Sequence, residues 1–333
     1  MKSFLSFLAL AISAISAQVL VSYNAQNPLV IGAGPEQMTY FPGGDDGTFN
    51  VQGNKMVLTS NPYVKTVAPS PGGTLDHVKW LAYINTAFTI PTDGKELVLT
   101  VKGTSEIFGT KKNPFCVSRN DPRLASIGIN TLDLTTNIVA DFFITNDKIY
   151  ALYERLPFAR TAENNYASFT YLVPVADRKN KCDDFKLQIA FNGKSKYLRF
   201  LVDGKEVLRV EKLGFRLTGF GADYLVLDLA GVEQEAFPVT IQAGFGTFSL
   251  LDAYSACTKT ICNGVLRKCP RSKKDQGLVK LVTTPNFYFF PGTNKPATFV
   301  SDGVNPETRI FGQGAQLKLC SLSVSINKAP RKH

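Results

Sequence analysis

Apolar and polar residues alternate over the middle of the chain, residues 141–210. Four runs show this period of two, at 141–160, 166–175, 184–191 and 197–210, and a turn at 202–205 with Asp203 and Gly204 divides the last run. A period of two, with Gly and Asp at the breaks, predicts antiparallel strands with one buried face. The middle of the chain is therefore expected to form an antiparallel β-sheet.

Similar runs recur along the rest of the chain, and no long segment has the apolar spacing of a helix. They lie at residues 55–59, 78–88, 96–102, 138–144, 149–156, 224–229, 239–243, 287–290 and 316–325. Many short strands with Gly- and Asp-bearing turns are typical of a sandwich or jelly roll. We predict an all-β fold, an antiparallel two-sheet jelly-roll sandwich, in one domain over residues 18–326.

The first 17 residues have the pattern of a secretory signal peptide. Lys2 gives a positive start, residues 4–15 form an apolar run, and Ser16 and Ala17 are small residues suited to a cleavage site. The apolar run is too short to span a bilayer, and a buried N-terminal helix is the alternative. The chain is therefore expected to be secreted, without membrane insertion.

The cysteines fit an exported chain, because an even number in such a chain suggests disulfides. There are six of them, Cys116, Cys182, Cys257, Cys262, Cys269 and Cys320. Three lie in the basic segment 255–277, which we predict to be a disulfide-rich loop inserted into the sandwich. A zinc knuckle is disfavoured, because four and six residues separate these three cysteines and no histidine lies nearby. No metal or cofactor is predicted, and residues 327–333 are expected to form a basic tail.

The formal net charge of the chain is +10. Loss of Lys2 with the signal peptide leaves 36 basic and 27 acidic residues, a net charge of +9. In an exported protein this charge favours acidic polysaccharides or anionic surfaces over nucleic acid as partners. A solvated basic surface without a partner is the alternative.

Three of the predicted strands place polar and aromatic side chains on one face each. Alternation groups Lys186 with Gln188, and Tyr197 with Arg199, away from their apolar neighbours. If the strand at 166–173 joins them in one curved sheet, this face is a groove in which tyrosines stack on sugar rings and the other side chains donate hydrogen bonds. The solvent-exposed face of a sheet gives the same pattern.

Charged residues follow Tyr153 in the segment from residue 150 to residue 160. Glu154 and Arg155 are adjacent on a strand and must point to opposite faces, so one of them is expected to point inward. Glu154 is a candidate general acid or base, Tyr153 a candidate ligand contact, and Arg155 and Arg160 candidate anion-binding residues. A structural ion pair at a strand end is the simpler alternative.

His77 is the one histidine apart from the C-terminal His333, so any histidine-dependent mechanism has to use it. We consider it a second candidate catalytic residue, with a structural hydrogen-bonding role as the alternative. The sequence has no G-x-S-x-G, H-E-x-x-H, P-loop or G-x-G-x-x-G motif. Asp45 and Asp46 lie in a glycine-rich turn that calcium can use, although a plain surface turn is the favoured explanation.

Several of these segments resemble a family of secreted bacterial and fungal proteins that has no established activity. The resemblance covers about residues 43–252 and rests on Asp76-His-Val-Lys-Trp80, Asp121-Pro-Arg-Leu-Ala125, the run 150–158 and Gly246-Thr-Phe-Ser-Leu-Leu-Asp252. It implies a fold similar to the concanavalin-A-like lectin and glucanase jelly roll. The Glu-x-Asp-x-(x)-Glu strand of such glucanases is absent, and the Gln-Ile-His of jelly-roll alginate lyases is Gln188-Ile-Ala190 here. The resemblance therefore transfers a fold but no activity.

Three hypotheses about function follow. The first is a secreted, monomeric jelly-roll protein that binds a carbohydrate in a concave groove, with cleavage left open. The second is an enzyme outside the glycosidases, in which Glu154 or His77 is the acid or base and Arg155 or Arg160 binds an anionic ligand. The third is a non-catalytic surface protein whose basic loop binds polyanions.

Overall fold

The computed structural model describes most of the chain as strands and the turns between them. It covers residues 17–67, 78–113, 117–180, 182, 184–221, 224–250, 260–262, 265–267, 298–300 and 311–330. In these ranges no α-helix is present and the one helical element is a 3₁₀ turn, η1, Thr110–Lys112. No helix in the described part of the chain is long and apolar enough to cross a membrane.

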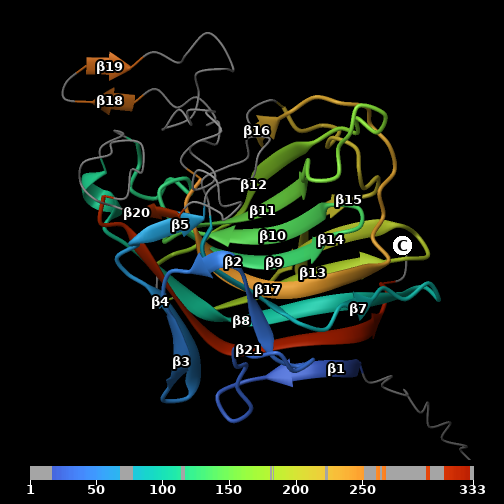
Figure 1. The fold of residues 1–333 in the computed structure, drawn as a ribbon, viewed down its shortest axis with the longest axis horizontal. Helices are drawn as coiled ribbons and strands as arrows, with labels where there is room; N and C mark the ends of the chain where they lie inside the picture. The colour runs from blue at the N-terminus through green and yellow to red at the C-terminus, as the bar shows by residue number, and fades with distance from the viewer. Residues whose placement is uncertain are drawn as a thin grey trace, which may run out of the picture.

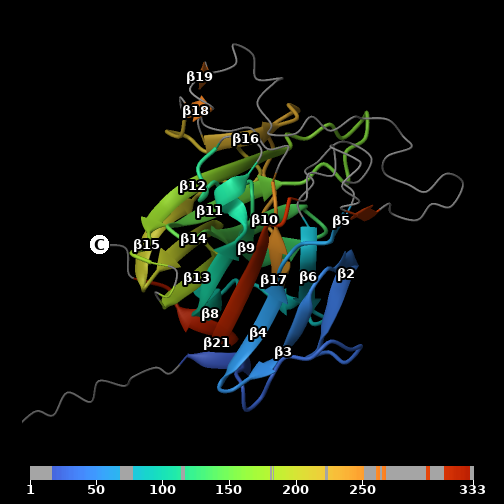
Figure 2. The ribbon, with the colours of Figure 1, turned by 90° about the vertical axis from the view of Figure 1, so that its left-hand side faces the viewer.

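One sheet has eight strands in the order β15-β14-β13-β8-β21-β4-β3, with β1 paired to β21. The two longest strands, β8 and β21, pair antiparallel over nearly their whole length and lie side by side, teal and red, in Figures 1 and 2. The strand bounds are β1 Gln18–Tyr23, β3 Thr48–Gln52, β4 Lys55–Ser60, β8 Lys95–Phe108, β13 Phe185–Asn192, β14 Tyr197–Val202, β15 Lys205–Val210 and β21 Gly314–Lys328.

The second sheet has nine strands in the order β16-β12-β11-β10-β9-β17-β6-β2, with β7 paired to β17. All its pairs are antiparallel. The bounds are β2 Met38–Asp45, β6 Val78–Ile84, β7 Phe88–Thr89, β9 Ser126–Asp133, β10 Ile138–Ile144, β11 Lys148–Arg155, β12 Phe169–Asp177, β16 Leu225–Asp228 and β17 Thr240–Phe248. Two short pairs stand apart from both sheets, β5 Lys65–Val67 with β20 Thr298–Val300, and β18 Thr260–Cys262 with β19 Val265–Arg267.

The two sheets pack face to face around one apolar core. The inner faces supply alternate residues of each strand, as in Phe142 of β10 and Phe200 of β14, whose rings meet edge to face with centroids 5.3 Å apart. Trp80 of β6 stacks on Phe245 of β17, with centroids 5.5 Å apart. These contacts explain why period-two alternation predicts the fold, because each strand buries every second side chain between the sheets.

The nine-stranded sheet is also buried on its outer face, the face that points away from the eight-stranded sheet. A second apolar cluster lies there, with Val139, Phe143, Leu152, Leu172 and Phe248 each less than a tenth exposed. An antiparallel sheet often has one solvated face, so this burial is a departure from the simple pattern. It produces strands in which nearly every side chain is buried, such as β9 and β10.

The predicted all-β, two-sheet sandwich is confirmed, and the turn at 202–205 divides β14 from β15 as expected. The grouping of the strand at 166–173 with those at 184–191 and 197–210 is wrong, because β12 belongs to the nine-stranded sheet and β13 and β14 to the other. The predicted run at 287–290 and most of the loop 255–277 lie outside the described residues.

Candidate functional site

A line of residues crosses the outer face of the nine-stranded sheet. Strand register places Tyr83 of β6 opposite Gly244 of β17, and Gly244 opposite Asn130 of β9. Asn130 in turn bonds to Asp141 of β10, and Glu154 of β11 lies diagonally from Asp141, because Asp141 pairs with Leu152 and Val139 with Glu154. We call the site formed by Tyr83, Asn130, Asp141 and Glu154 the acidic pocket.

Glu154 is buried with a single polar partner. Its strand neighbour Thr170 on β12 lies directly opposite, and the Thr170 hydroxyl donates to Glu154 Oε1 at 2.5 Å. The side chain is 6% exposed. Apart from Asp141, the described side chains next to it on this face are mostly apolar, so few other groups are available to solvate this carboxyl.

Asp141 fills a local gap between β9 and β10. The two strands pair on either side, at Val139 with Leu132 and at Phe142 with Ile129, but not between these positions. There the Thr131 N–H donates to Asp141 Oδ1 at 2.8 Å, and Asn130 Nδ2 donates to Asp141 Oδ2 at 2.5 Å. The carboxyl thus replaces a ladder acceptor and leaves the backbone donor satisfied.

The ring of Tyr83 lies over a glycine. A Cβ at Gly244 would come within 2.7 Å of Tyr83 Cδ1 and 2.3 Å of the Ala82 oxygen, so no other residue fits there without a shift. Phe248 uses Gly128 in the same way, since a Cβ at Gly128 would lie 2.4 Å from Phe248 Cε2. Glycines in these strands therefore make room for the aromatic walls of the acidic pocket.

Apolar side chains surround these polar groups. The acidic pocket has about 610 Å³ of space, its open mouth included, and its lining is mostly aliphatic and aromatic. Two lining residues near the surface, Leu134 and Phe158, are 62% and 49% exposed and lie on the turns that follow β9 and β11. A mostly apolar pocket with a few placed polar groups is the usual form of a small-ligand site.

The apolar surroundings shift the titration of the pocket's acids. Burial raises the pKa of Glu154 to about 7, against the opposing hydrogen bond from Thr170. Burial also raises the pKa of Asp141 well above its usual range, and the nearby Glu154 adds to the shift, while the donors from Thr131 and Asn130 oppose it. Burial and the charges of the two acids raise the pKa of the Tyr83 hydroxyl.

In the part of the chain that the structure describes, no cation balances these two carboxyls. Within the described ranges neither Asp141 nor Glu154 forms an ion pair, and their polar contacts are the neutral donors named above. A buried acid without a counter-charge holds its proton to a higher pH than an exposed acid does, and Glu154, with its pKa of about 7, is partly protonated at neutral pH. The acidic pocket can therefore donate protons or hydrogen bonds to a ligand, and its lone pairs can accept them.

The other residues of the segment after β10 point elsewhere. Tyr153 is buried in the core between the sheets, and its hydroxyl accepts the Gly214 N–H at 2.7 Å. Arg155 points to the same inner face, because adjacent strand residues such as Glu154 and Arg155 point to opposite faces, as predicted. Its Nη1 donates to the Gln234 oxygen at 3.1 Å, and its guanidinium lies 4.1 Å from the centroid of the Tyr166 ring. Their proposed ligand contacts stay predictions, but neither side chain reaches the acidic pocket.

Arg160 is half-buried in the loop after β11. Its Nε donates to Asn165 Oδ1 at 3.0 Å and its Nη1 to the Leu229 oxygen at 3.0 Å. These bonds tie the loop to the segment before β12 and to the end of β16. The structure thus gives Arg160 a stabilising role in the loop, and anion binding by it stays a prediction.

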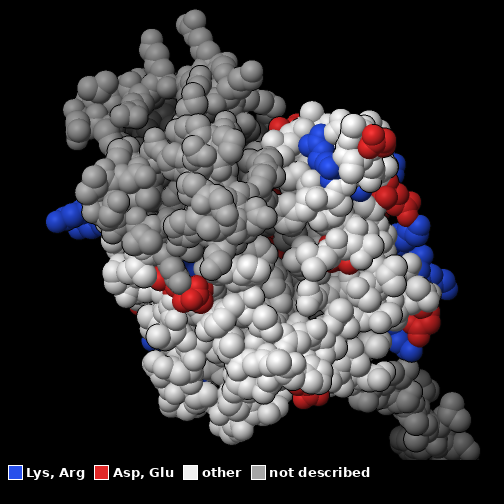
Figure 3. Space-filling model, in the orientation of Figure 1, with Lys and Arg blue, Asp and Glu red and all other residues white. Residues whose placement is uncertain are grey.

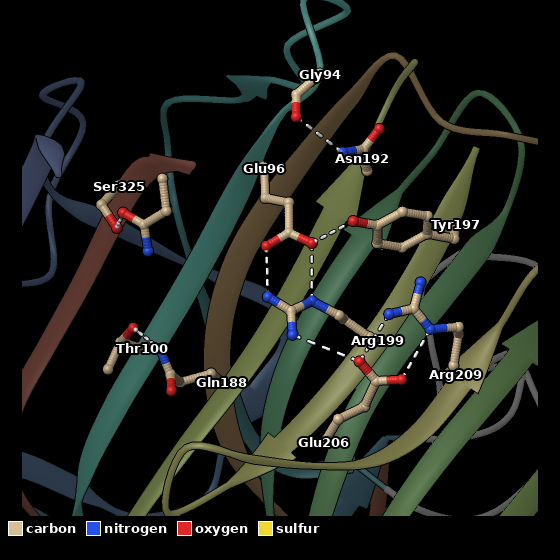
Figure 4. Close-up of polar contacts among 11 residues, drawn as sticks. Gly94, Glu96, Thr100, Gln188, Asn192, Tyr197, Arg199, Glu206, Arg209 and Ser325 are labelled. Carbon is tan, nitrogen blue, oxygen red and sulfur yellow. Dashed lines mark hydrogen bonds and ion pairs between the residues drawn. The ribbon is translucent and has the colours of Figure 1, made fainter. Parts of the chain in front are cut away.

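The remaining predicted contacts lie on the outer face of the eight-stranded sheet (Figure 4). Tyr197 donates to Glu96 Oε1 at 2.7 Å, and Arg199 donates to both Glu96 oxygens, from Nε at 2.8 Å and Nη2 at 2.6 Å. Glu206 links Arg199 to Arg209. Gln188 lies farther along this face. The structure therefore separates the residues predicted for one groove between two sheets.

Several other predictions fall outside the described residues, including His77 and four of the six cysteines' side chains. Of the two cysteines that are described, Cys182 is exposed and Cys320 half-buried, and both are free thiols. Asp46 is buried and accepts the Val64 N–H. In the described part of the chain no group of three or more His, Cys, Asp or Glu side chains is arranged to hold a metal ion.

Sequence analysis missed Asp141, Asn130 and Tyr83. The signal for Asp141 is a single acid in the strand 138–144, whose other members are all apolar. An acid in such a strand must be buried on one face or the other. Asn130 and Tyr83 give no such signal, because their place in the site depends on how β9, β17 and β6 pair.

Charged residues elsewhere on this side of the molecule follow a different pattern. In the view of Figure 3, cationic and anionic side chains lie intermixed along one edge, while most of the visible described surface is uncharged. The ion pair of Arg216 with Asp228, at 2.6 Å, belongs to such mixed surface charge. The unpaired carboxyls of the acidic pocket are thus unlike these surface acids.

The fold and the site define a jelly-roll sandwich with a buried acidic pocket on the outer face of one sheet. The model of a family of unknown function, DUF6081, matches residues 36–328, and the chain belongs to this family. An uncharacterized protein of Acanthamoeba polyphaga mimivirus is 27% identical over 366 residues, which cover 84% of this chain and 82% of the viral protein.

Several solved structures resemble this chain at low sequence identity. The exolytic PL7 alginate lyase AlyA5 from Zobellia galactanivorans has a TM-score of 0.43 and 11% identity, over 93% of this chain and all (100%) of that one. The structure of LamAcat from the same organism has a TM-score of 0.41 and 7% identity, over 92% of this chain and 97% of that one. At these scores the likenesses do not identify a function for this chain.

Proposed function

We propose that the acidic pocket binds a carbohydrate and that Glu154 transfers a proton to it. A sugar ring presents hydroxyl groups at its edge and apolar C–H groups on its faces. The acidic pocket offers both kinds of partner, with carboxyl and amide groups beside the aromatic walls formed by Phe143, Phe158 and Phe248. Asp141 and Asn130, fixed to each other by a hydrogen bond, are placed to bind hydroxyl groups.

The observation that carries this proposal is the state of Glu154, which is buried, faces a pocket and has no counter-charge among the described residues. With a pKa of about 7, it is partly protonated at neutral pH, which is what a general acid needs. In the proposed step Glu154 gives its proton to the oxygen of a glycosidic bond, the C–O bond breaks, and water supplies the new hydroxyl and returns a proton to Glu154.

The setting that we propose is extracellular. The signal-like pattern of the first 17 residues supports export, and polysaccharides are abundant outside cells. A monomer with one domain over residues 18–326 belongs to the same proposal. The non-glycosidase alternative uses Glu154 or His77 as the acid or base and Arg155 or Arg160 to bind an anionic substrate.

The test is product analysis with a panel of neutral and acidic polysaccharides. We expect the mature protein to bind at least one of them and to release shorter products, and Glu154→Gln to lower the rate by about 100-fold or more while binding remains. Glu163→Gln, which alters an exposed loop carboxylate, is the matched control and should leave the rate unchanged. Binding without products would reduce the proposal to a lectin, and full activity of Glu154→Gln would exclude Glu154 as the acid.

A further inference from the structure

Four lysines form a zigzag row on the outer face of the eight-stranded sheet. They are Lys186 of β13, Lys102 of β8, Lys318 of β21 and Lys55 of β4, on four neighbouring strands. Lys186 lies directly opposite Lys102, and Lys318 lies opposite Val57, two residues from Lys55. Their strand neighbours on the inner face are buried, so the lysines point outward.

The charges in this lysine row are not balanced by ion pairs. Lys102 and Lys318 are exposed, Lys55 and Lys186 half-buried, and none of the four forms an ion pair with any part of the chain that the structure describes. Two acids lie beside the row, Glu106 and Asp184. Like charges directly opposite on paired strands destabilise a sheet, so the pairing of Lys186 with Lys102 has a cost to folding.

Polar uncharged groups also lie beside the lysine row, together with the two acids. Gln188 Nε2 donates to Thr100 Oγ1 at 3.3 Å, and this pair lies two residues along the strands from Lys186 and Lys102, on the face drawn in Figure 4. Gln316 Nε2 donates to Thr59 Oγ1 at 3.0 Å. Lys55, Lys318 and Gln316 also line a cleft of about 640 Å³, its open side included. Hydroxyl, amide and ammonium groups together match the oxygens of a charged polysaccharide.

We propose that this lysine row binds a linear anionic polysaccharide. With strands about 4.8 Å apart, the row extends over about 14 Å, the length of a short run of sugar residues. A flexible chain with a regular charge can follow the zigzag and relieve the repulsion between Lys186 and Lys102. This surface is independent of the acidic pocket, because the two lie on the outer faces of different sheets.

Anionic membranes and nucleic acids fit this face less well. No large, exposed apolar side chain lies on the described residues of β13, β8, β21 or β4, so the row has nothing to insert into a lipid surface. The face around the row presents amides and hydroxyls, and a single-stranded nucleic acid usually binds to aromatic platforms. The charge and the polar surroundings therefore favour the polysaccharide.

The test compares two double variants with the same change of charge. Lys102→Gln/Lys186→Gln removes the centre of the row, and Lys194→Gln/Lys212→Gln removes two exposed lysines elsewhere. The probes are alginate, as the uronate polymer, and neutral dextran. We expect alginate to bind the wild type at 50 mM NaCl and to bind about fivefold or more weakly to the row variant, with less than about twofold change in the control.

Stability measurements separate binding from misfolding. Because the row variant loses a repulsion, its midpoint in urea should equal or exceed that of the wild type. Equal loss of alginate binding in both double variants would overturn the proposal, as would tighter binding of a duplex DNA oligonucleotide or anionic vesicles than of alginate. If the row variant loses alginate binding but still cleaves the substrate of the acidic pocket, both proposals are supported. If the wild type binds alginate through the row but cleaves no polysaccharide, the proposal for the lysine row is kept and the proposed function of the acidic pocket fails.

Discussion

Glu154 is the residue whose position is hardest to explain by stability alone. Burial of an ionisable group without a counter-charge destabilises the charged form, and an apolar residue at this position would fill the same space. The structure offers it one hydroxyl, that of Thr170, and a second acid, Asp141, as its nearest polar surroundings. Such an arrangement favours a proton on the carboxyl near neutral pH, a property that a proton donor needs.

The raised pKa of Glu154 predicts a pH dependence of stability. The folded protein holds this proton more tightly than the unfolded chain does, in which the pKa of the group is 4.5. The contribution of Glu154 to stability is therefore fully present below about pH 4.5 and is lost as pH rises to about 7. Over that window the loss amounts to about 3 kcal/mol for this group. We expect Glu154→Gln to flatten the curve of unfolding free energy against pH between these limits.

Urea unfolding at half-unit steps of pH checks this expectation. Glu163→Gln is again the control, because this carboxylate is exposed in a loop and should leave the slope unchanged. A Glu154→Gln curve parallel to the wild type would mean that the carboxyl does not titrate in this window. The assignment of Glu154 as a proton donor at neutral pH would then be withdrawn.

At the residue scale the sequence shows what is unusual but not what is adjacent. Glu154 stands out because it interrupts an apolar alternation, and the same reasoning applies to Asp141. Tyr153 and Arg155 looked equally promising, yet alternation alone does not tell which face of the strand is the core between the sheets and which is the pocket. The structure places both on the inner face, away from Glu154.

At the scale of elements, β8, β14 and β15 are joined by a polar network on the outer face of their sheet. Glu96 is fully buried and accepts three bonds from Tyr197 and Arg199. A side chain that is engaged in this way must break its bonds before it can contact a ligand. The network therefore explains Tyr197 and Arg199 as stabilising residues without reference to a ligand.

This network predicts a contrast between two neighbouring ion pairs. Removal of Glu96 leaves the largely buried Arg199 with its longer contact to Glu206 as its one described ion pair, so Glu96→Ala should cost about 3 kcal/mol of unfolding free energy. Arg209→Ala, which breaks the half-exposed pair with Glu206, should cost less than about 1 kcal/mol. Urea unfolding of both variants, with Glu96→Ala/Arg199→Ala to close a double-mutant cycle, measures the difference.

The outcome decides between two roles for Arg199. A coupling energy above about 1 kcal/mol between Glu96 and Arg199 supports the stabilising role. Glu96→Ala with nearly unchanged stability, together with a loss of polysaccharide binding in Arg199→Ala, would restore Arg199 as a ligand contact. Gln188 is not part of this ion-pair network, so its substitution by Ala should leave the free energy of unfolding unchanged in either case.

Many strands were predictable from the sequence, but the pairing of strands with one another was not. The run at 138–144 matches β10, and the turn with Asp203 and Gly204 falls where predicted. β9, with all eight residues buried, shows no alternation and was missed. The sheet to which β12 belongs is set by pairing with β11 and β16, a long-range choice that a local pattern does not contain.

At the scale of the whole molecule, the sandwich separates two surfaces of different character. The nine-stranded sheet has a buried outer face with carboxyls that tend to be neutral, and the eight-stranded sheet has a polar outer face with a net positive row. Between them lie the packed side chains of the core, such as Phe142 and Phe200. A core of this kind, about 10 Å thick, keeps groups on the two outer faces beyond direct contact.

This separation predicts that the two surfaces respond independently to changes in solution conditions and to mutation. Alginate should raise the melting temperature of the wild type at 50 mM NaCl, and the effect should fade at 300 mM NaCl, where screening shortens the reach of the lysine charges. The variant Lys102→Gln/Lys186→Gln should lose this response and keep the fall in stability between pH 4.5 and about 7. Glu154→Gln should show the reverse, because its carboxyl does not belong to the row.

Combining the three substitutions should give free-energy changes that add within about 0.5 kcal/mol, since the sites share no partner. A larger deviation, or an alginate response that disappears in Glu154→Gln alone, would show that the two faces are coupled through the core and that a single ligand engages both.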